Sequence, residues 1–134
     1  MGHEINIETE KDQVLSLAEQ VVQLVAESGV QEGMCHITLP HTTAGLTITS
    51  KYDEADFADI KSELRRLVPT RVDFFHQFDT PEDAAGHIKS VLTGVSLTIM
   101  ITKGRLLLGN SQGIFFLEFD GPRSRKYHVK ITSD

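Results

Sequence analysis

The sequence lacks the features that mark secreted, membrane or disulfide-rich proteins. It has one cysteine and four prolines among 134 residues. No apolar run approaches the roughly 20 residues that span a membrane, so no membrane partner is expected. The single Cys35 excludes an internal disulfide and is predicted to pack as a small apolar side chain. The N-terminus lacks the basic-then-apolar pattern of a secretory signal, so we expect a cytoplasmic protein.

Length and charge narrow the class further. A chain of 134 residues fits one domain, placed at residues 1–134. A charged fraction of 24% beside a hydrophobic fraction of 40% excludes disordered and coiled-coil classes. The formal net charge of −6 argues against non-specific nucleic-acid binding, so no nucleic-acid partner is expected.

Apolar periodicity predicts a mixed fold. A wide helical stripe begins after the capping sequence at 9–12 and ends at Gly29. A second helix is predicted over 53–67, with a buried side made of Phe57, Ile60, Leu64 and Leu67. Strands are predicted at 4–8, 33–39, 46–49, 95–102, 105–108, 112–119 and 126–132. Lys103-Gly104 is predicted to form a two-residue hairpin turn between two of them. This order predicts an α+β fold: a single compact domain with a mainly antiparallel β-sheet and packed helices.

A third predicted helix carries the densest polar chemistry. Thr80 suits its N-cap and Pro81 its first turn. Asp83, His87 and Ser90 recur at spacings of four and three residues and therefore share one face. The apolar side is predicted to comprise Ala84, Ala85, Ile88, Val91 and Leu92. Such a helix suits a polar pocket, although an ordinary Asp–His pair on a solvated face fits the same spacing.

Three histidines are candidates for a metal site. His41 lies in a loop between predicted strands, His76 follows two phenylalanines, and His87 lies on the polar helical face. None has a close metal-motif spacing, so the fold would have to bring them together. Because neutral imidazoles are good zinc ligands, we expect all three to bind a divalent cation, zinc above all, with Asp83 or Asp53 as a nearby acid. A hydrogen-bonding pocket without metal is the alternative.

Two loops are candidate anion sites. The first runs through Gly109-Asn110-Ser111-Gln112-Gly113 and could turn its amides toward an anion. The second, at 120–126, places Arg123, Arg125 and Lys126 after a turn, which suits a phosphate group. The alternatives are a plain strand connection for the first loop and a solvated turn for the second.

Several of these segments, in this order, resemble the YjbQ-like family of secondary thiamine-phosphate synthase enzymes. The motifs are His-Thr-Thr-Ala-Gly-Leu-Thr-Ile at 41–48, Gly-His-Ile-Lys-Ser at 86–90 continuing to Gly-Val-Ser-Leu-Thr at 94–98, Gly-Arg-Leu at 104–106, Leu-Gly at 108–109, Gln-Gly-Ile at 112–114 and Glu-Phe-Asp-Gly-Pro-Arg at 118–123. The resemblance covers nearly the whole chain. It implies a compact α+β fold, a homotrimer and a polar pocket that contains histidine.

The same resemblance implies a transferase that joins two small phosphorylated molecules. The residues expected to act in catalysis are His87, Asp53 and Asp83. Those expected to bind substrate or phosphate are Lys89, Ser90, Ser111, Gln112, Arg123 and Arg125.

Two departures from the family pattern weaken this transfer of activity. Thr49-Ser50-Lys51 stands where the family commonly has Asn-Glu-Asn, and Asn110-Ser111 stands where it commonly has Thr-Trp. A non-catalytic trimeric module that binds a small ligand or a metal, and a metal-dependent hydrolase, are the alternative functions.

Overall fold

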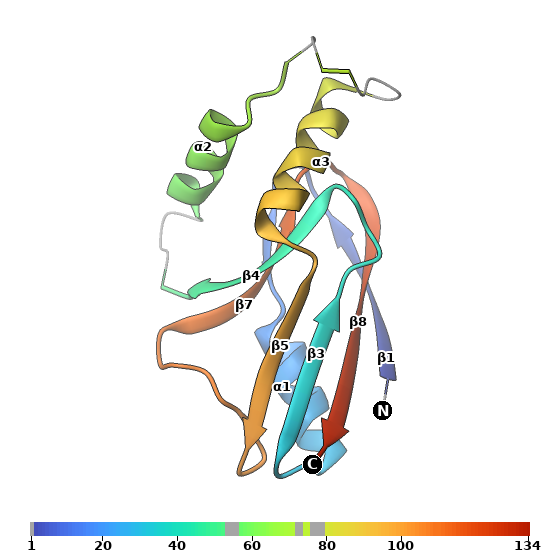
Figure 1. Cartoon of the computed structure of the whole chain (residues 1–134), viewed down its shortest axis with the longest axis vertical. Coiled ribbons are helices and arrows are strands. Elements are labelled where there is room, and N and C mark those ends of the chain that lie inside the picture. The colour runs from blue at the N-terminus through green and yellow to red at the C-terminus, as the bar shows by residue number, and fades with distance from the viewer. Residues whose placement is uncertain (1, 53–56, 72–73, 76–79) are drawn as a thin grey trace.

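The computed structural model describes residues 2–52, 57–71, 74–75 and 80–134. Its elements, in chain order, are β1 (Gly2–Thr9), β2 (Val14–Ser16), α1 (Ala18–Ser28), β3 (Gly33–Thr38), β4 (Ala44–Ser50), α2 (Ala58–Leu67), α3 (Pro81–Thr93), β5 (Ser96–Thr102), β6 (Arg105–Leu106), β7 (Gln112–Glu118) and β8 (Arg123–Ser133) (Figure 1). The predicted α+β class is confirmed. Within the described ranges, no helix combines the length and apolar character needed to cross a membrane.

The strands form two antiparallel sheets. The larger has the order β1-β8-β3-β5-β6, and the smaller has the order β2-β7-β4. The long strand β8 pairs with both β1 and β3, while β7 pairs with β2 on one side and β4 on the other. Lys103 and Gly104 join β5 to β6 with positive φ angles of 52° and 76°, which confirms the predicted two-residue hairpin turn.

The core lies between the two sheets and α1. Its fully buried side chains come from both sheets and from the helix, among them Cys35, Ile37, Phe116, Val129 and Val21. Alternation along β3 and β8 points these residues inward and leaves the other face of the larger sheet half-buried or exposed. The larger sheet therefore has one face in the core.

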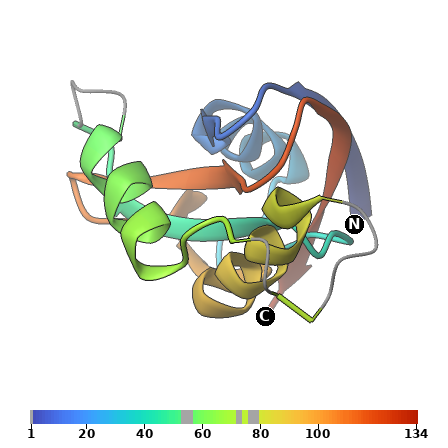
Figure 2. The same ribbon diagram turned by 90° about the horizontal axis from the view of Figure 1, so that it is seen from above.

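Strand β7 is buried on both faces. Ile114 and Phe116 belong to the core, whereas Phe115 packs edge-to-face on Phe57 with ring centroids 4.7 Å apart. Leu117 also lies on this second face, where α2 and α3 form a further layer (Figures 1 and 2). Because apolar residues occur at successive positions of this strand, both of its faces need cover, and the second face needs a further layer. The chain's own helices provide that layer.

The first helix begins later than its apolar stripe predicted. Val14 and Leu15 do not belong to it but form β2, which pairs with Leu117 and Phe116 of β7. The apolar stripe predicted too early a helix start because two adjacent apolar residues fit a helix face and a short, partly buried strand equally well. The predicted end is confirmed: Gly29 adopts a left-handed φ of 72° and its N–H donates to the Ala26 carbonyl.

Helix α2 lies over the smaller sheet and is itself only partly buried. Its described start follows Phe57, and residues 53–56 of the predicted helix lie outside the described residues. None of its residues is fully buried, and Leu67, predicted to be inward, is 60% exposed. Ile60 and Leu64 face the sheet and line a narrow cleft, so the predicted buried side is correct only in part.

Candidate functional site

The site is built around α3, which begins as its sequence predicted. The hydroxyl of Thr80 accepts a hydrogen bond from the Asp83 amide at 3.1 Å, and Pro81 occupies the first turn. This cap satisfies one of the amides that have no partner within the helix. The helix ends at Gly94, whose N–H donates to the Ser90 carbonyl at 2.8 Å.

The buried face of α3, however, differs from the face that its apolar residues predicted. Asp83, Lys89 and Ser90 are buried together with Ala84 and Ala85, which were correctly placed. The exposed apolar residues are Ile88 at 40%, Val91 at 83% and Leu92 at 60%. Apolar content alone thus gave the wrong inward side for much of this helix.

Two glycines explain how the polar flank packs inward. A Cβ built on Gly45 of β4 would lie 2.1 Å from the Thr93 hydroxyl, and one on Gly86 would lie 3.0 Å from the Phe119 carbonyl oxygen. Both sites therefore depend on the missing side chain. They let α3 approach the smaller sheet closely, with its small and polar residues at the contact.

His41 and His87 lie on one open surface hollow. The hollow is lined by His41 and Thr42 from the loop before β4, and by His87, Ser90, Val91, Gly94 and Val95 at α3 and its end. His87 is held at both ring nitrogens: Nε2 lies 3.1 Å from the Asp83 carboxylate and Nδ1 lies 3.0 Å from the Thr42 carbonyl oxygen. Since both partners are acceptors, both contacts are hydrogen bonds only when the ring carries both protons. Asp83 thereby orients His87 as the spacing predicted.

His41 is anchored from the other side of the hollow. Its Nε2 lies 3.0 Å from the Lys126 amide nitrogen and 3.1 Å from the Lys126 carbonyl oxygen, so the β8 backbone occupies this nitrogen in either tautomer. Burial lowers the pKa of His41, and the nearby Arg125 cation lowers it further. His41 therefore presents a neutral imidazole at pH 7.

Behind the hollow lies a buried polar network that the sequence motifs did not predict. Arg125 donates to Glu118 through Nε at 2.8 Å and Nη2 at 2.5 Å, and Nη2 also donates to the Thr43 hydroxyl at 2.8 Å. Glu118 further accepts from the Thr9 hydroxyl at 2.5 Å and from the Asp120 amide at 3.1 Å. The side chains of Arg125 and Glu118 are only 5% and 0% exposed. An acid inside the apolar run 114–119 was the available signal, because a buried carboxylate requires a partner.

Hydrogen bonding sets the charge of Glu118. Burial alone would raise the pKa of this carboxyl, but the bonds from Arg125 and Thr9 outweigh it, and the pKa lies below its ordinary value. Both members of the pair are therefore charged at neutral pH. Arg125 directly precedes Lys126, whose backbone contacts His41, and its charge acts on His41 from behind the hollow.

The other predicted phosphate ligands are dispersed. Arg123 binds Asp120 through Nε at 3.0 Å and Nη2 at 2.6 Å, with its side chain 42% exposed. Ser111 and Gln112 lie at the opposite end of β7 from Glu118, and six strand steps of about 3.3 Å place Gln112 roughly 20 Å away. Lys89 follows His87 by two residues, about 200° around the helix, and so lies on its other side. The structure groups His41, His87 and Ser90, with Asp83 behind them.

The metal prediction rests partly on residues that are not described. Asp53 and His76 lie outside the described residues. In the part of the chain that the structure describes, no group of three His, Cys, Asp or Glu side chains could hold a metal ion. Both nitrogens of His87 already face oxygen atoms, so binding zinc would require one of those contacts to break. The described residues alone do not fit a zinc site.

Fold and site together define a small α+β protein with a histidine-bearing hollow backed by a buried ion pair. Sequence comparison gives the family: the UPF0047 protein YjbQ-like profile matches residues 3–134, and the chain belongs to this family. The resemblance to the YjbQ-like family inferred from its motifs is confirmed.

Relatives and solved structures agree with this assignment. The chain is 43% identical over 124 residues to a UPF0047 protein of Methanocaldococcus jannaschii, covering 92% of this chain and 88% of the relative. It is 35% identical over 125 residues to the UPF0047 protein YugU of Bacillus subtilis, covering 92% of each. The crystal structure of a YjbQ/UPF0047 protein from Clostridium acetobutylicum superposes with a TM-score of 0.89 at 42% identity, covering 97% of this chain and 99% of that one. A YbjQ-like protein of unknown function from Sulfolobus solfataricus gives 0.93 at 25% identity, covering 100% and 97%.

Proposed function

We propose that the protein is a transferase of the thiamine-phosphate synthase type that acts on small phosphorylated molecules at the His41–His87 hollow. The observation that carries the proposal is that His41, from the loop before β4, and His87 and Ser90, from α3, line one open hollow. Each imidazole is held by hydrogen bonds, and such preorganisation is what positioning and proton transfer require.

The proposed reaction joins a pyrimidine methyl diphosphate to a thiazole phosphate. A thiazole ring nitrogen supplies the electron pair for the new C–N bond, the C–O bond to the diphosphate breaks, and the diphosphate departs with that electron pair. His87 stabilises the charge that develops on the departing oxygen, with its Nδ1–H turned from the exposed Thr42 carbonyl toward the substrate. Asp83 retains the ring at Nε2 during this exchange. His41 and Ser90 position the substrates by hydrogen bonds.

No step in this scheme uses a metal. Zinc bound through His41, His76 and His87 remains part of the proposal as an alternative way to hold substrate oxygen. Elemental analysis of protein purified without a His-tag tests it. Zinc at one ion per chain or per site supports that alternative. Absence of metal, together with no rise in melting temperature on zinc titration, leaves a hydrogen-bonding pocket.

The activity is tested with both thiamine precursors and four proteins. These are the unaltered chain, His87→Ala, Arg123→Ala and the control His36→Ala, whose imidazole contacts Thr98 on the larger sheet away from the hollow. We expect product from the unaltered protein and the control and little from His87→Ala. Loss in Arg123→Ala supports the predicted phosphate role of Arg123. Equal product from all four proteins refutes the transferase. Binding without turnover supports a non-catalytic module, and phosphate release from single substrates supports a hydrolase.

We also propose that the chain assembles as a homotrimer through the outer side of α3. Ile88, Val91 and Leu92 expose an apolar stripe on this helix, and Val95 continues it at 37% exposure. Contiguous exposed apolar residues of this kind are typical of protein interfaces. Val91 and Val95 also line the hollow, so a neighbouring copy that packs on this stripe would form one side of the hollow.

Light scattering tests the assembly. Three chains of 14.9 kDa give about 45 kDa. We expect this mass for the unaltered protein and for Val22→Asp, a control at a 53% exposed position on α1. Val91→Asp should lower it toward the mass of one chain. A single-chain mass for the unaltered protein at micromolar concentration refutes the trimer.

A further inference from the structure

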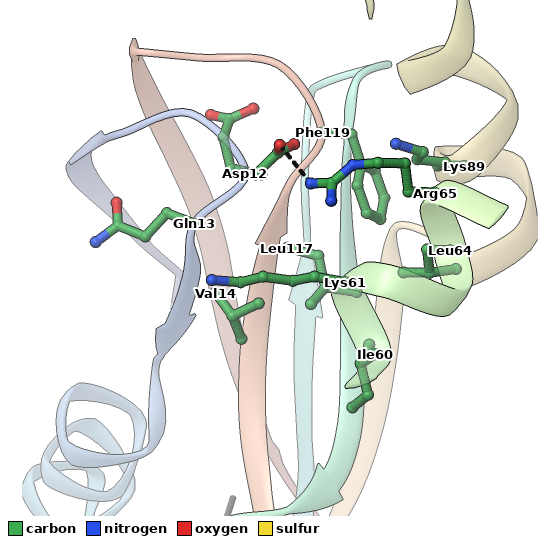
Figure 3. Close-up of a pocket in the computed structure, with 11 residues that line it drawn as sticks. Asp12, Gln13, Val14, Ile60, Lys61, Leu64, Arg65, Lys89, Leu117 and Phe119 are labelled. Carbon is green, nitrogen blue, oxygen red and sulfur yellow. Dashed lines mark hydrogen bonds and ion pairs between the residues drawn. The ribbon is translucent and has the colours of Figure 1, made fainter. Parts of the chain in front are cut away.

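A second polar cleft lies on the other side of α3 from the histidines. It is bounded by α2, α3 and the segment before β2, and Figure 3 shows Lys89 from α3 and Arg65 from α2 meeting there beside Phe119. Lys89 is only 7% exposed, and its ammonium lies 5.9 Å from the centre of the Phe119 ring. Among the described residues, none forms a hydrogen bond or ion pair with this ammonium. A buried cation without a counter-charge is costly, so its retention here calls for a reason.

The acids that face Lys89 already have cationic partners. Asp12 accepts from Arg65 Nη2 at 3.0 Å, and Glu82 is paired with Lys11. Glu118, at the inner end, is bound by Arg125. Burial lowers the pKa of Lys89. The Asp12 and Glu82 carboxylates oppose this and the Arg65 cation adds to it, and the pKa lies below its ordinary value. The positive charge of Lys89 is therefore not balanced within the cleft.

The size of the cleft restricts what can enter it. The outer hollow has a volume of about 240 Å³ and is lined by Lys11, Asp12, Arg65, Thr70, Glu82, Lys89 and Phe119. The inner slot between Ile60, Leu64 and Leu117 has about 20 Å³, room for roughly one water molecule. A compact polar group fits the outer hollow, while a ring does not fit the slot.

We infer that this cleft binds the phosphate group of a small molecule, with Lys89 and Arg65 as its principal contacts. A phosphate gives the Lys89 ammonium the anionic acceptor that the chain itself does not provide. Arg65 keeps N–H donors in addition to the Nη2 bond to Asp12, and the Thr70 hydroxyl adds a neutral donor. This site goes beyond the proposed transferase reaction, because it uses no residue of the His41–His87 hollow.

Calorimetry with inorganic phosphate and with methyl phosphate tests the inference. The unaltered protein should bind at least one of them at millimolar concentration or tighter, and tighter binding of methyl phosphate identifies an ester as the preferred source. Lys89→Met keeps the apolar stem and removes the charge, so we expect at least a tenfold loss of affinity. Arg65→Gln, at an exposed side chain, should weaken binding several-fold without affecting folding. The control Lys130→Met removes an exposed lysine from β8 and should bind as the unaltered protein does.

A stability measurement separates loss of the site from loss of the fold. Lys89→Met removes an unbalanced buried charge, so the free protein should melt no lower than the unaltered chain and should lose the phosphate-dependent rise in melting temperature. His87→Ala should retain phosphate binding, because His87 is not part of this cleft. The phosphate site is therefore tested independently of the transferase proposal. No binding of either probe by the unaltered protein, or equal binding by Lys89→Met, overturns the inference.

Discussion

The buried Glu118–Arg125 pair gives the sharpest test of how this structure is stabilised. Glu118→Gln retains the side-chain volume but removes the charge that balances Arg125. Loss of one partner of a buried ion pair typically costs about 3–5 kcal/mol. Because Arg125 keeps the Thr43 hydroxyl and carbonyl as acceptors, we expect a value near the lower end, about 3 kcal/mol. Arg125→Met should cost at least as much, since it leaves a buried carboxylate without its main donor.

A double-mutant cycle isolates the interaction from these separate costs. Urea unfolding at one fixed protein concentration gives the free energy of unfolding for each single variant and for the double variant. We expect the double variant to lose less than the sum of the singles, by about 2 kcal/mol. As a control, Glu63→Gln removes an exposed partner of Arg66 and should change the free energy by about 0.5 kcal/mol or less. Strictly additive losses at Glu118 and Arg125 would contradict the buried network.

The same pair predicts an acid dependence. The pKa of Glu118 is lower in the folded chain than its ordinary value of 4.5, so its contribution is complete above that value and is lost as pH falls toward the folded pKa. The stability of Glu118→Gln should therefore fall less steeply below pH 4.5 than that of the unaltered protein. If the stability of the two proteins falls equally steeply with decreasing pH, the Glu118 carboxylate is not the cause of the acid dependence.

Two further predictions concern local structure. Thr80→Ala removes the acceptor for the Asp83 amide and should lower the free energy of unfolding by about 1 kcal/mol in urea titrations, whereas Thr80→Ser should restore it. Cys35 is fully buried, and burial raises the pKa of its thiol to about 11. A thiol reagent at pH 8 should therefore leave the native protein unlabelled and should label one site per chain after denaturation. Rapid labelling without denaturant would contradict the place of Cys35 in the core.

The sequence predicted the elements that depend on local chemistry. The Thr80 cap, the end of α1 at Gly29 and the Lys103-Gly104 turn each follow from a backbone preference that a few adjacent residues specify. Alternation likewise located the strands, although β8 begins at Arg123, three residues before its predicted start. These features need no knowledge of distant contacts.

Features that depend on long-range packing were less accessible. The strand at Val14–Ser16 exists because β7 offers it a partner about 100 positions later. For the candidate site, the spacing of Asp83 and His87 predicted their pairing, but nothing in the sequence placed His41 beside His87. The acid at Glu118 inside an apolar run signalled a buried partner, but spacing along the chain did not identify Arg125, which lies on the following strand, as that partner.

The inverted orientation of α3 links assembly to chemistry and leads to one last prediction. Because Val91 lies both on the exposed stripe and at the rim of the hollow, a neighbouring copy seated on the stripe would also complete the hollow. Lys89 lies on the buried side, away from that stripe. Val91→Asp should therefore lose transferase product along with assembly while retaining phosphate binding at Lys89. A monomeric Val91→Asp that still forms product at the rate of the unaltered protein would show that each chain carries a complete hollow. Loss of phosphate binding in that variant would instead show that the Lys89 cleft depends on the assembled state.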